Sequence, residues 1–151
     1  KSTVVNTLAG RPIAKTGDKP AITQMQQRVQ LSHDLVLFDT PGFLWHKLDP
    51  PVRGYRLAVT GAVSDRVTEF EDLALFAAAF LAERYPTALR TLYKLEDVPA
   101  DPERLLEAIG RRRGFVGKGA VVDRGRAAER LILDFRAGAF GALSLERPGD
   151  P

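Results

Sequence analysis

The apolar run Leu-Val-Leu-Phe at residues 35–38 ends in Asp39-Thr40-Pro41-Gly42, and this junction constrains the chain more than any other stretch. Val and Phe favour the extended backbone, so the run predicts a buried strand that the Pro-Gly pair would end. A carboxylate at the tip of a buried strand requires a partner, and a Mg²⁺ ion or its water shell is a suitable one. The Gly42 N–H could approach a terminal phosphate because no Cβ stands in the way.

Two stretches upstream carry further residue types directed at phosphate. The chain opens with Lys1-Ser2-Thr3, which matches the end of the P-loop pattern G-x-x-x-x-G-K-[ST] without its glycines. Lys1 could contact the β- and γ-phosphates, and Ser2 could offer its hydroxyl to Mg²⁺. Thr23 could place its hydroxyl on the metal and its N–H on the γ-phosphate. Together the signals predict a nucleotide site of Lys1, Ser2, Thr3, Thr23 and Gly42, with Ser2, Thr23 and Asp39 as metal ligands.

Each of these signals also has an ordinary explanation when it is taken alone. Lys-Ser-Thr is a common helix start, in which Ser2 or Thr3 would cap the first turn. Thr23 is a β-branched residue that could simply enter a strand. The order of the signals along the chain is what favours the nucleotide site over these alternatives.

The periodicity of apolar residues predicts a change of architecture near Pro50-Pro51. Before it, we expect a helix over 2–8, a long loop over 10–23 and a hairpin of strands 25–31 and 35–39. After it, apolar residues recur at helical spacing in 71–85 and in stretches that begin at Asp101 and Asp123. The pattern predicts an α/β part followed by a small helical part.

Composition sets limits on compartment and partners. The 151 residues carry a net charge of +3, which permits an anionic partner without requiring one. No cysteine is present, so the chain has no disulfide partner and no thiolate metal site, and a reducing compartment is allowed. The longest apolar run, at 73–82, is too short to cross a bilayer, and we expect no membrane partner.

Several motifs together resemble the circularly permuted GTPases that assemble the large ribosomal subunit (RbgA/YlqF type). The motifs are Lys1-Ser2-Thr3, the Pro-x-x-Thr of 20–23, the stretch 39–45, Thr60-Gly61-Ala62, and the late segments around 113–115, 123, 134–136 and 138–145. The similarity runs nearly end to end. Ala21 departs from it, standing where the family usually has Gly, and His46 stands where Pro is common.

The resemblance implies Mg²⁺-dependent GTP hydrolysis that the ribosomal subunit stimulates, commonly with K⁺, in a cytoplasmic protein. It implies that residues 1–51 form the later part of a P-loop GTPase domain and that residues 52–70 are a connecting segment. It also implies that residues 71–146 form an all-α domain that docks on ribosomal RNA. In this family the guanine-reading N-K-x-D motif precedes the P-loop, and the only Asn here is Asn6. This chain alone is then expected to be inactive, because it begins inside the P-loop.

The sequence offers candidate residues for RNA binding but none for catalysis. Phe43 stands where many GTPases have a Gln that orients the attacking water, so no catalytic residue is assigned. A basic cluster could track RNA phosphates, although it could also be a solvated helix end. Two alternatives remain open: a permuted GTPase whose helical tail binds protein, and a catalytically inert RNA-binding remnant. The RNA candidates are Arg111, Arg112, Arg113, Lys118, Arg126 and Arg130.

Overall fold

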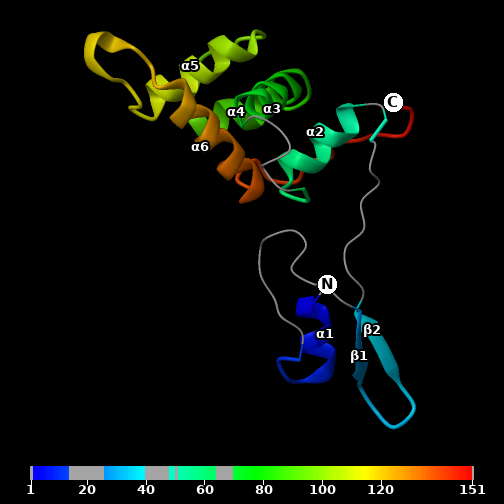
Figure 1. The fold of residues 1–151 in the computed structure, drawn as a ribbon. Coiled ribbons are helices and arrows are strands. Elements are labelled where there is room, and N and C mark those ends of the chain that lie inside the picture. The colour runs from blue at the N-terminus through cyan, green and yellow to red at the C-terminus, as the bar shows by residue number, and fades with distance from the viewer. Residues whose placement is uncertain (1, 14–25, 40–47, 50, 64–69, 151) are drawn as a thin grey trace. The chain divides into compact units, whose positions relative to one another are not determined.

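The computed structural model describes residues 2–13, 26–39, 48–49, 51–63 and 70–150 (Figure 1). The chain divides into two compact units, residues 1–47 and residues 48–151, which we call unit 1 and unit 2. The described residues of unit 1 form one helix and one hairpin, and those of unit 2 form a helical assembly. No helix among the described residues has both the length and the apolar character that crossing a membrane requires.

Unit 1 contains helix α1 (Ser2–Ala9) and the antiparallel strands β1 (Gln27–Gln30) and β2 (Val36–Asp39). Gly10 follows α1 with a φ of +66°, a left-handed conformation that glycine adopts without steric cost and that ends the helix. Val5 of α1 and Val29 of β1 are buried together in a small apolar cluster. The helix and the hairpin expected in this part of the sequence are therefore confirmed.

The expectation that residues 35–38 form a buried strand is wrong for the described part of unit 1. Leu35 and Phe38 are 55% and 56% exposed. The sheet has two strands, in which Leu37 pairs with Val29 on the face that meets α1, and Phe38 pairs with Arg28 on the opposite face. Because no described residue covers that opposite face, Phe38 stays open to solvent.

Unit 2 is built from helices. They are α2 (Val52–Val59), α3 (Phe70–Arg84), α4 (Pro86–Tyr93), α5 (Pro102–Arg112) and α6 (Arg124–Arg136), with a short 3₁₀ helix η2 at Lys118–Ala120. Within the described residues of this unit, the one pair with strand-like bonding is the bridge between Val116 and Val122. The helices expected near 71–85, after Asp101 and after Asp123 are confirmed.

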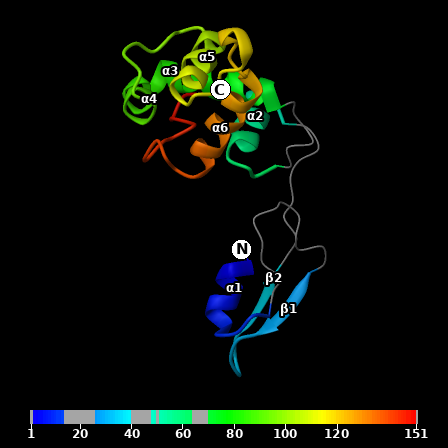
Figure 2. The ribbon, with the colours of Figure 1, turned by 90° about the vertical axis from the view of Figure 1, so that its left-hand side faces the viewer.

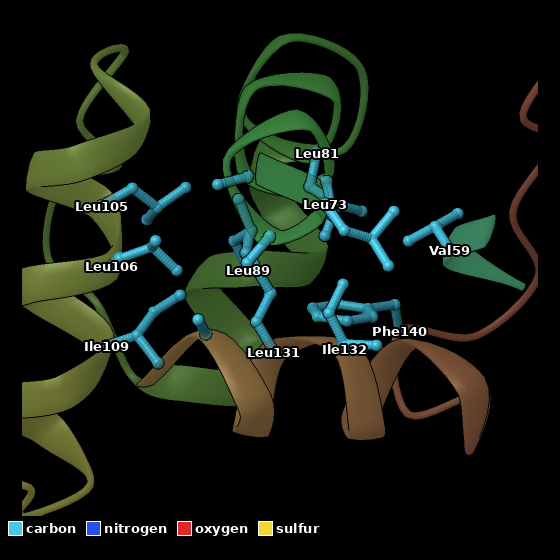
Figure 3. Packing of buried hydrophobic residues seen from close by; sticks show 14 of the residues in the cluster. Val59, Leu73, Leu81, Leu89, Leu105, Leu106, Ile109, Leu131, Ile132 and Phe140 are labelled. Atoms are coloured by element: carbon cyan, nitrogen blue, oxygen red, sulfur yellow. The ribbon is translucent and has the colours of Figure 1, made fainter. Parts of the chain in front are cut away.

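The core of unit 2 lies between α3, α5 and α6. Fully buried leucines and isoleucines from these helices meet there, joined by Leu89 of α4 and Phe140 (Figure 3). Burying one such side chain contributes roughly 1.5–3 kcal/mol relative to leaving it in water. Helix α2 falls in the stretch expected to be a connecting segment, and it adds Ala58 and Val59 to this core. The labelled core residues of the three helices are Leu73, Leu81, Leu105, Leu106, Ile109, Leu131 and Ile132.

Short-range capping sets where the helices of unit 2 begin and end. The Asp101 carboxylate accepts a hydrogen bond from Glu103 N at the start of α5, and Asp123 accepts one from Arg126 N at the start of α6, both at 3.0 Å. Gly114 ends α5 with a φ of +73°, which lets Phe115 N reach the Gly110 carbonyl at 2.8 Å. The hydrogen bonds of Asp101 and Asp123 confirm that the two helices begin where the sequence predicted.

The last residues of the chain bind the ends of α2 and α3. The Arg84 guanidinium donates two hydrogen bonds of 3.0 Å to the Asp150 carboxylate, and Arg56 donates one of 3.1 Å to Glu146. The Tyr85 hydroxyl accepts from Ser144 N and donates to the Ser144 carbonyl. The hydrogen bond from Arg84 lowers the pKa of Asp150 below its ordinary value.

Replacing Asp150 by asparagine is expected to remove part of the acid sensitivity of unit 2. Because the pKa of Asp150 is lowered in the folded state, its contribution to stability is present above the unfolded pKa of about 3.9 and is lost as the pH falls through the lower folded value. Thermal melts between pH 6 and about pH 2 would measure this, with the exposed Asp97→Asn as the control. If acid lowers the melting temperature of the Asp150→Asn protein as much as that of the wild type, the prediction is contradicted.

Candidate nucleotide site and basic surface

Unit 1 brings two of the predicted site segments to one end. The N-terminal end of α1 and the carboxyl end of β2 lie at the same end of this unit in both views (Figures 1 and 2). The register explains this position for the strand, since Asp39, the last residue of β2, pairs with Gln27, the first residue of β1. An anion bound at the start of α1 would thus share this end of the unit with the backbone of Asp39.

The structure describes only part of the predicted site. Lys1, Thr23, Gly42 and Phe43 lie outside the described residues, and Ser2 and Asp39 are described by their backbone alone. Thr3 is exposed in the first turn of α1, and its carbonyl accepts a hydrogen bond of 3.0 Å from the Thr7 hydroxyl. The assignment of Lys1, Ser2, Thr3, Thr23 and Gly42 to nucleotide, and of Ser2, Thr23 and Asp39 to metal, stays a prediction.

The described part of this end suits a phosphate group. The first N–H groups of a helix have no partner within the helix and carry a partial positive charge, and the first turn of α1 contains no acidic residue that would compete with an anion. Packing of Val5 on Val29 holds α1 on the hairpin, and the Asn6 side chain accepts a hydrogen bond of 2.9 Å from Ile13 N. The described residues at the start of α1 are therefore compatible with a bound phosphate group.

Unit 2 separates the six basic candidates into two groups. Arg130 donates from Nε to the Asp134 carboxylate at 3.0 Å, and Arg113 lies 3.5 Å from the same carboxylate. Asp134 is only 3% exposed and also accepts a hydrogen bond of 3.0 Å from the Tyr93 hydroxyl. Burial and the neighbouring carboxylate raise the pKa of Tyr93, so its hydroxyl stays a donor. Arg113 and Arg130 are thus paired with a buried carboxylate, although their own side chains are 33% and 44% exposed.

The other candidates are exposed to solvent and form fewer contacts with acidic side chains. Arg112 lies 3.0 Å from Glu96 in an exposed pair, which is worth little in water. Arg111 and Lys118 are exposed and form no ion pair with another described residue. The Arg126 guanidinium lies over the Phe115 ring, 4.7 Å from its centroid. The cation surface open to a partner therefore centres on Arg111, Lys118 and Arg126.

Two residues of this region were missed in the sequence. Phe115 was part of the motif at 113–115, but its stacking with Arg126 depends on how α6 returns beside the end of α5. Arg124 was not among the RNA candidates; it pairs with Glu103 and Glu107, and its hydrogen bond lowers the pKa of Glu107. The Arg130–Asp134 ion pair could have been predicted from the sequence, because residues four apart on a helix lie on the same face.

The phosphate-directed motifs of the sequence and the helix–hairpin unit fit the P-loop GTPase class of nucleotide-binding proteins, which has an α/β fold. The family model of the 50S ribosome-binding GTPases matches residues 1–99, and the chain belongs to that family.

Its relatives include proteins named ribosome biogenesis GTPase A. The chain is 41% identical over 150 residues to the protein from Priestia megaterium, covering 99% of this chain and 52% of the relative. It is 43% identical over 148 residues to that of Bacillus pumilus, covering 98% and 52%, and 29% identical over 150 residues to that of Thermotoga maritima, covering 99% and 53%. The chain spans about half the length of the curated relatives it matches.

Proposed function

We propose that the intact protein is a GTPase that acts in assembly of the large ribosomal subunit. The observation that carries this proposal is the similarity to ribosome biogenesis GTPase A over nearly the whole chain. The placement of the α1 start and the β2 end at one end of unit 1 supports it, because a triphosphate and its Mg²⁺ require these two segments together (Figure 1). The place of action is the cytoplasm.

In this proposal each residue of the nucleotide site has one task. Lys1 neutralises charge on the β- and γ-phosphates, Ser2 and Thr3 begin the helix that faces them, and Gly42 offers its N–H to the γ-phosphate. Ser2, Thr23 and Asp39 hold Mg²⁺, directly or through its water. The metal, when bound, neutralises negative charge that develops on the transferred phosphoryl group. K⁺ would be an additional activating ion.

The helical unit supplies the contact with the ribosome. We assign residues 71–146 to an all-α domain that docks on ribosomal RNA, with residues 1–51 as part of the GTPase domain and 52–70 between them. The bound nucleotide would set the conformation of the segments that carry Thr23 and Gly42. Phe43 cannot hydrogen-bond water, so another group or the subunit must position the nucleophile. We expect the 151-residue chain alone to be inactive, because it contains neither the P-loop glycines nor an N-K-x-D motif.

Stimulated hydrolysis tests the proposed function directly. The intact protein should hydrolyse GTP slowly alone and faster when purified large subunits are added, with Mg²⁺ required and K⁺ increasing the rate over Na⁺. Small subunits at the same concentration are the control, and ATP in place of GTP tests the nucleotide. Equal rates with large subunits, with small subunits and with no subunit would overturn the proposal.

A further inference from the structure

Residues 143–150, near the end of the chain, contact both α2 and the end of α3, and we call them the strap (red in Figure 1). The strap forms neither helix nor strand. Leu143 and Leu145 pack against the core of unit 2 while remaining partly exposed. The N–H and the carbonyl of Ser144 both bond the Tyr85 hydroxyl, at 2.9 and 3.0 Å. A small number of side chains therefore determines where the strap lies.

The Asp150 carboxylate joins the end of α3 to α2. It accepts two hydrogen bonds of 3.0 Å from the Arg84 guanidinium, and it lies 3.9 Å from Arg56 of α2. Glu146 accepts a further hydrogen bond of 3.1 Å from Arg56, whose side chain is only 10% exposed. Two parallel bonds between a guanidinium and a carboxylate fix direction as well as distance. The strap thus bonds two helices that are separate in the sequence.

Helix α2 depends on other elements for its position. It has eight residues, and a helix this short is unstable in water unless it packs on something else. Its C-terminal end is held by Ala58 and Val59 in the core and by Arg136, which donates to both of their carbonyls. Toward its N-terminal end, Tyr55 stacks on Phe76 with the ring centroids 5.2 Å apart. Between these two attachments, the strap contacts the middle of the helix.

A groove of about 420 Å³ lies between α2 and the strap. Leu48, Leu57 and Leu145 line it with apolar surface, and Arg56 and Glu146 line it as well. A closely packed core resists displacement, whereas side-chain contacts across an open groove can separate without disturbing that core. The contact between the strap and α2 is therefore one that can open while the rest of unit 2 stays folded.

The order of elements along the chain gives α2 a particular place. It is the first helix after the stretch that contains Asp39 and Gly42, and both of these residues are assigned to the nucleotide site. A nucleotide-dependent change in that stretch reaches unit 2 along the chain through α2. If α2 is bonded firmly to α3, the helices respond together; if α2 is loose, its own displacement absorbs the change.

We propose that the strap couples the two units: it holds α2 on the helices of unit 2, so that nucleotide binding and partner binding affect each other. For the identity of the nucleotide and of the partner, this proposal rests on the proposed function. Coupling between two binding sites is reciprocal. Releasing the strap should therefore reduce the effect of the nucleotide on partner binding and the effect of the partner on nucleotide binding by the same factor.

Hydrogen–deuterium exchange of the intact protein, without nucleotide or subunits, measures how firmly the strap holds α2. The double variant Glu146→Gln, Asp150→Asn removes both carboxylates. Tyr85→Phe separately removes the hydroxyl that bonds Ser144 and keeps every charge. One hydrogen bond shifts such an opening equilibrium by about 2- to 10-fold, so peptides of α2 and of the strap should exchange at least about 2-fold faster in each variant.

The matched control is the double variant Asp97→Asn, Glu129→Gln. It makes the same change of charge at two exposed positions of unit 2 outside the strap. Its α2 peptides should exchange at the wild-type rate. Circular dichroism spectra and melting temperatures identify any variant in which the whole of unit 2, and not the strap alone, has become unstable.

Affinity for purified large subunits, measured with a non-hydrolysable GTP analogue and with GDP, tests the coupling. In the wild type and in the control, the two affinities should differ by at least about 5-fold, the lower end of typical coupling. In both strap variants the ratio should fall toward one. Hydrolysis of GTP without subunits should stay at the wild-type rate in every variant, because none of the changed residues belongs to the nucleotide site.

Two results would overturn the proposal. One is wild-type exchange of α2 in both strap variants, which would mean that the strap does not hold the helix. The other is faster exchange with an unchanged affinity ratio, which would mean that the strap holds α2 without coupling the units. A wild type that neither binds GTP nor responds to large subunits would instead remove the proposed function, while exchange would still decide whether the strap holds α2.

Discussion

Asp39→Ala in the intact protein is expected to abolish GTP hydrolysis stimulated by the large subunit, with a loss of at least about 100-fold. Asp39 ends β2 at the end of unit 1 where α1 begins (Figure 1), and we assign its carboxylate to Mg²⁺. The bound metal stabilises the charge that develops in the transition state by several kcal/mol. Each 1.4 kcal/mol of this stabilisation that is lost slows hydrolysis about 10-fold. Lys1→Ala should cause a comparable loss, because the lysine neutralises the same phosphates.

The matched control is Asp34→Ala in the hairpin turn. Asp34 is almost fully exposed and contacts His33, away from the strand end. This variant should hydrolyse GTP at the wild-type rate. Mg²⁺ titration gives a second readout, since Asp39→Ala should require more metal and Lys1→Ala should not. Unchanged turnover in either variant would refute the site.

Asp134→Ala is expected to destabilise unit 2 by about 3 kcal/mol. The carboxylate is nearly fully buried and holds three partners from three segments: Tyr93 of α4, Arg113 after α5, and Arg130 of α6. Removing one partner from a buried ion pair leaves the other charge uncompensated, at a typical cost of 3–5 kcal/mol. We expect the lower end because the Arg113 and Arg130 side chains are 33% and 44% exposed and can reach water.

Urea denaturation followed by circular dichroism measures this effect. Glu129→Ala, at an exposed position of the same helix, is the control and should stay within about 0.5 kcal/mol of the wild type. Asp134→Asn keeps an acceptor for the Tyr93 hydroxyl and should cost less than the alanine variant. If Asp134→Ala were as stable as Glu129→Ala, the cluster would have no structural role.

Fold prediction succeeded where the signal was local. Helix α6 could be read from its cap at Asp123 and from apolar residues at helical spacing, and both depend on neighbours within a turn or two. The hairpin could be predicted for the same reason, because the alternating apolar and polar residues and the turn residues lie within a few positions of one another. The exposure of Phe38 could not be predicted, because it depends on whether another segment covers the far face of the sheet.

For the candidate sites, the sequence by itself determined the residue types and their order: a P-loop end, an aspartate after an apolar strand, and a run of arginines. Only the tertiary structure decided which arginines remain open to a partner. Arg113 and Arg126 look alike in the sequence, yet one binds buried Asp134 and the other stacks on Phe115 at the surface. The difference depends on how α4, α5 and α6 pack, since an ion pair or ring contact forms between segments that no local pattern relates.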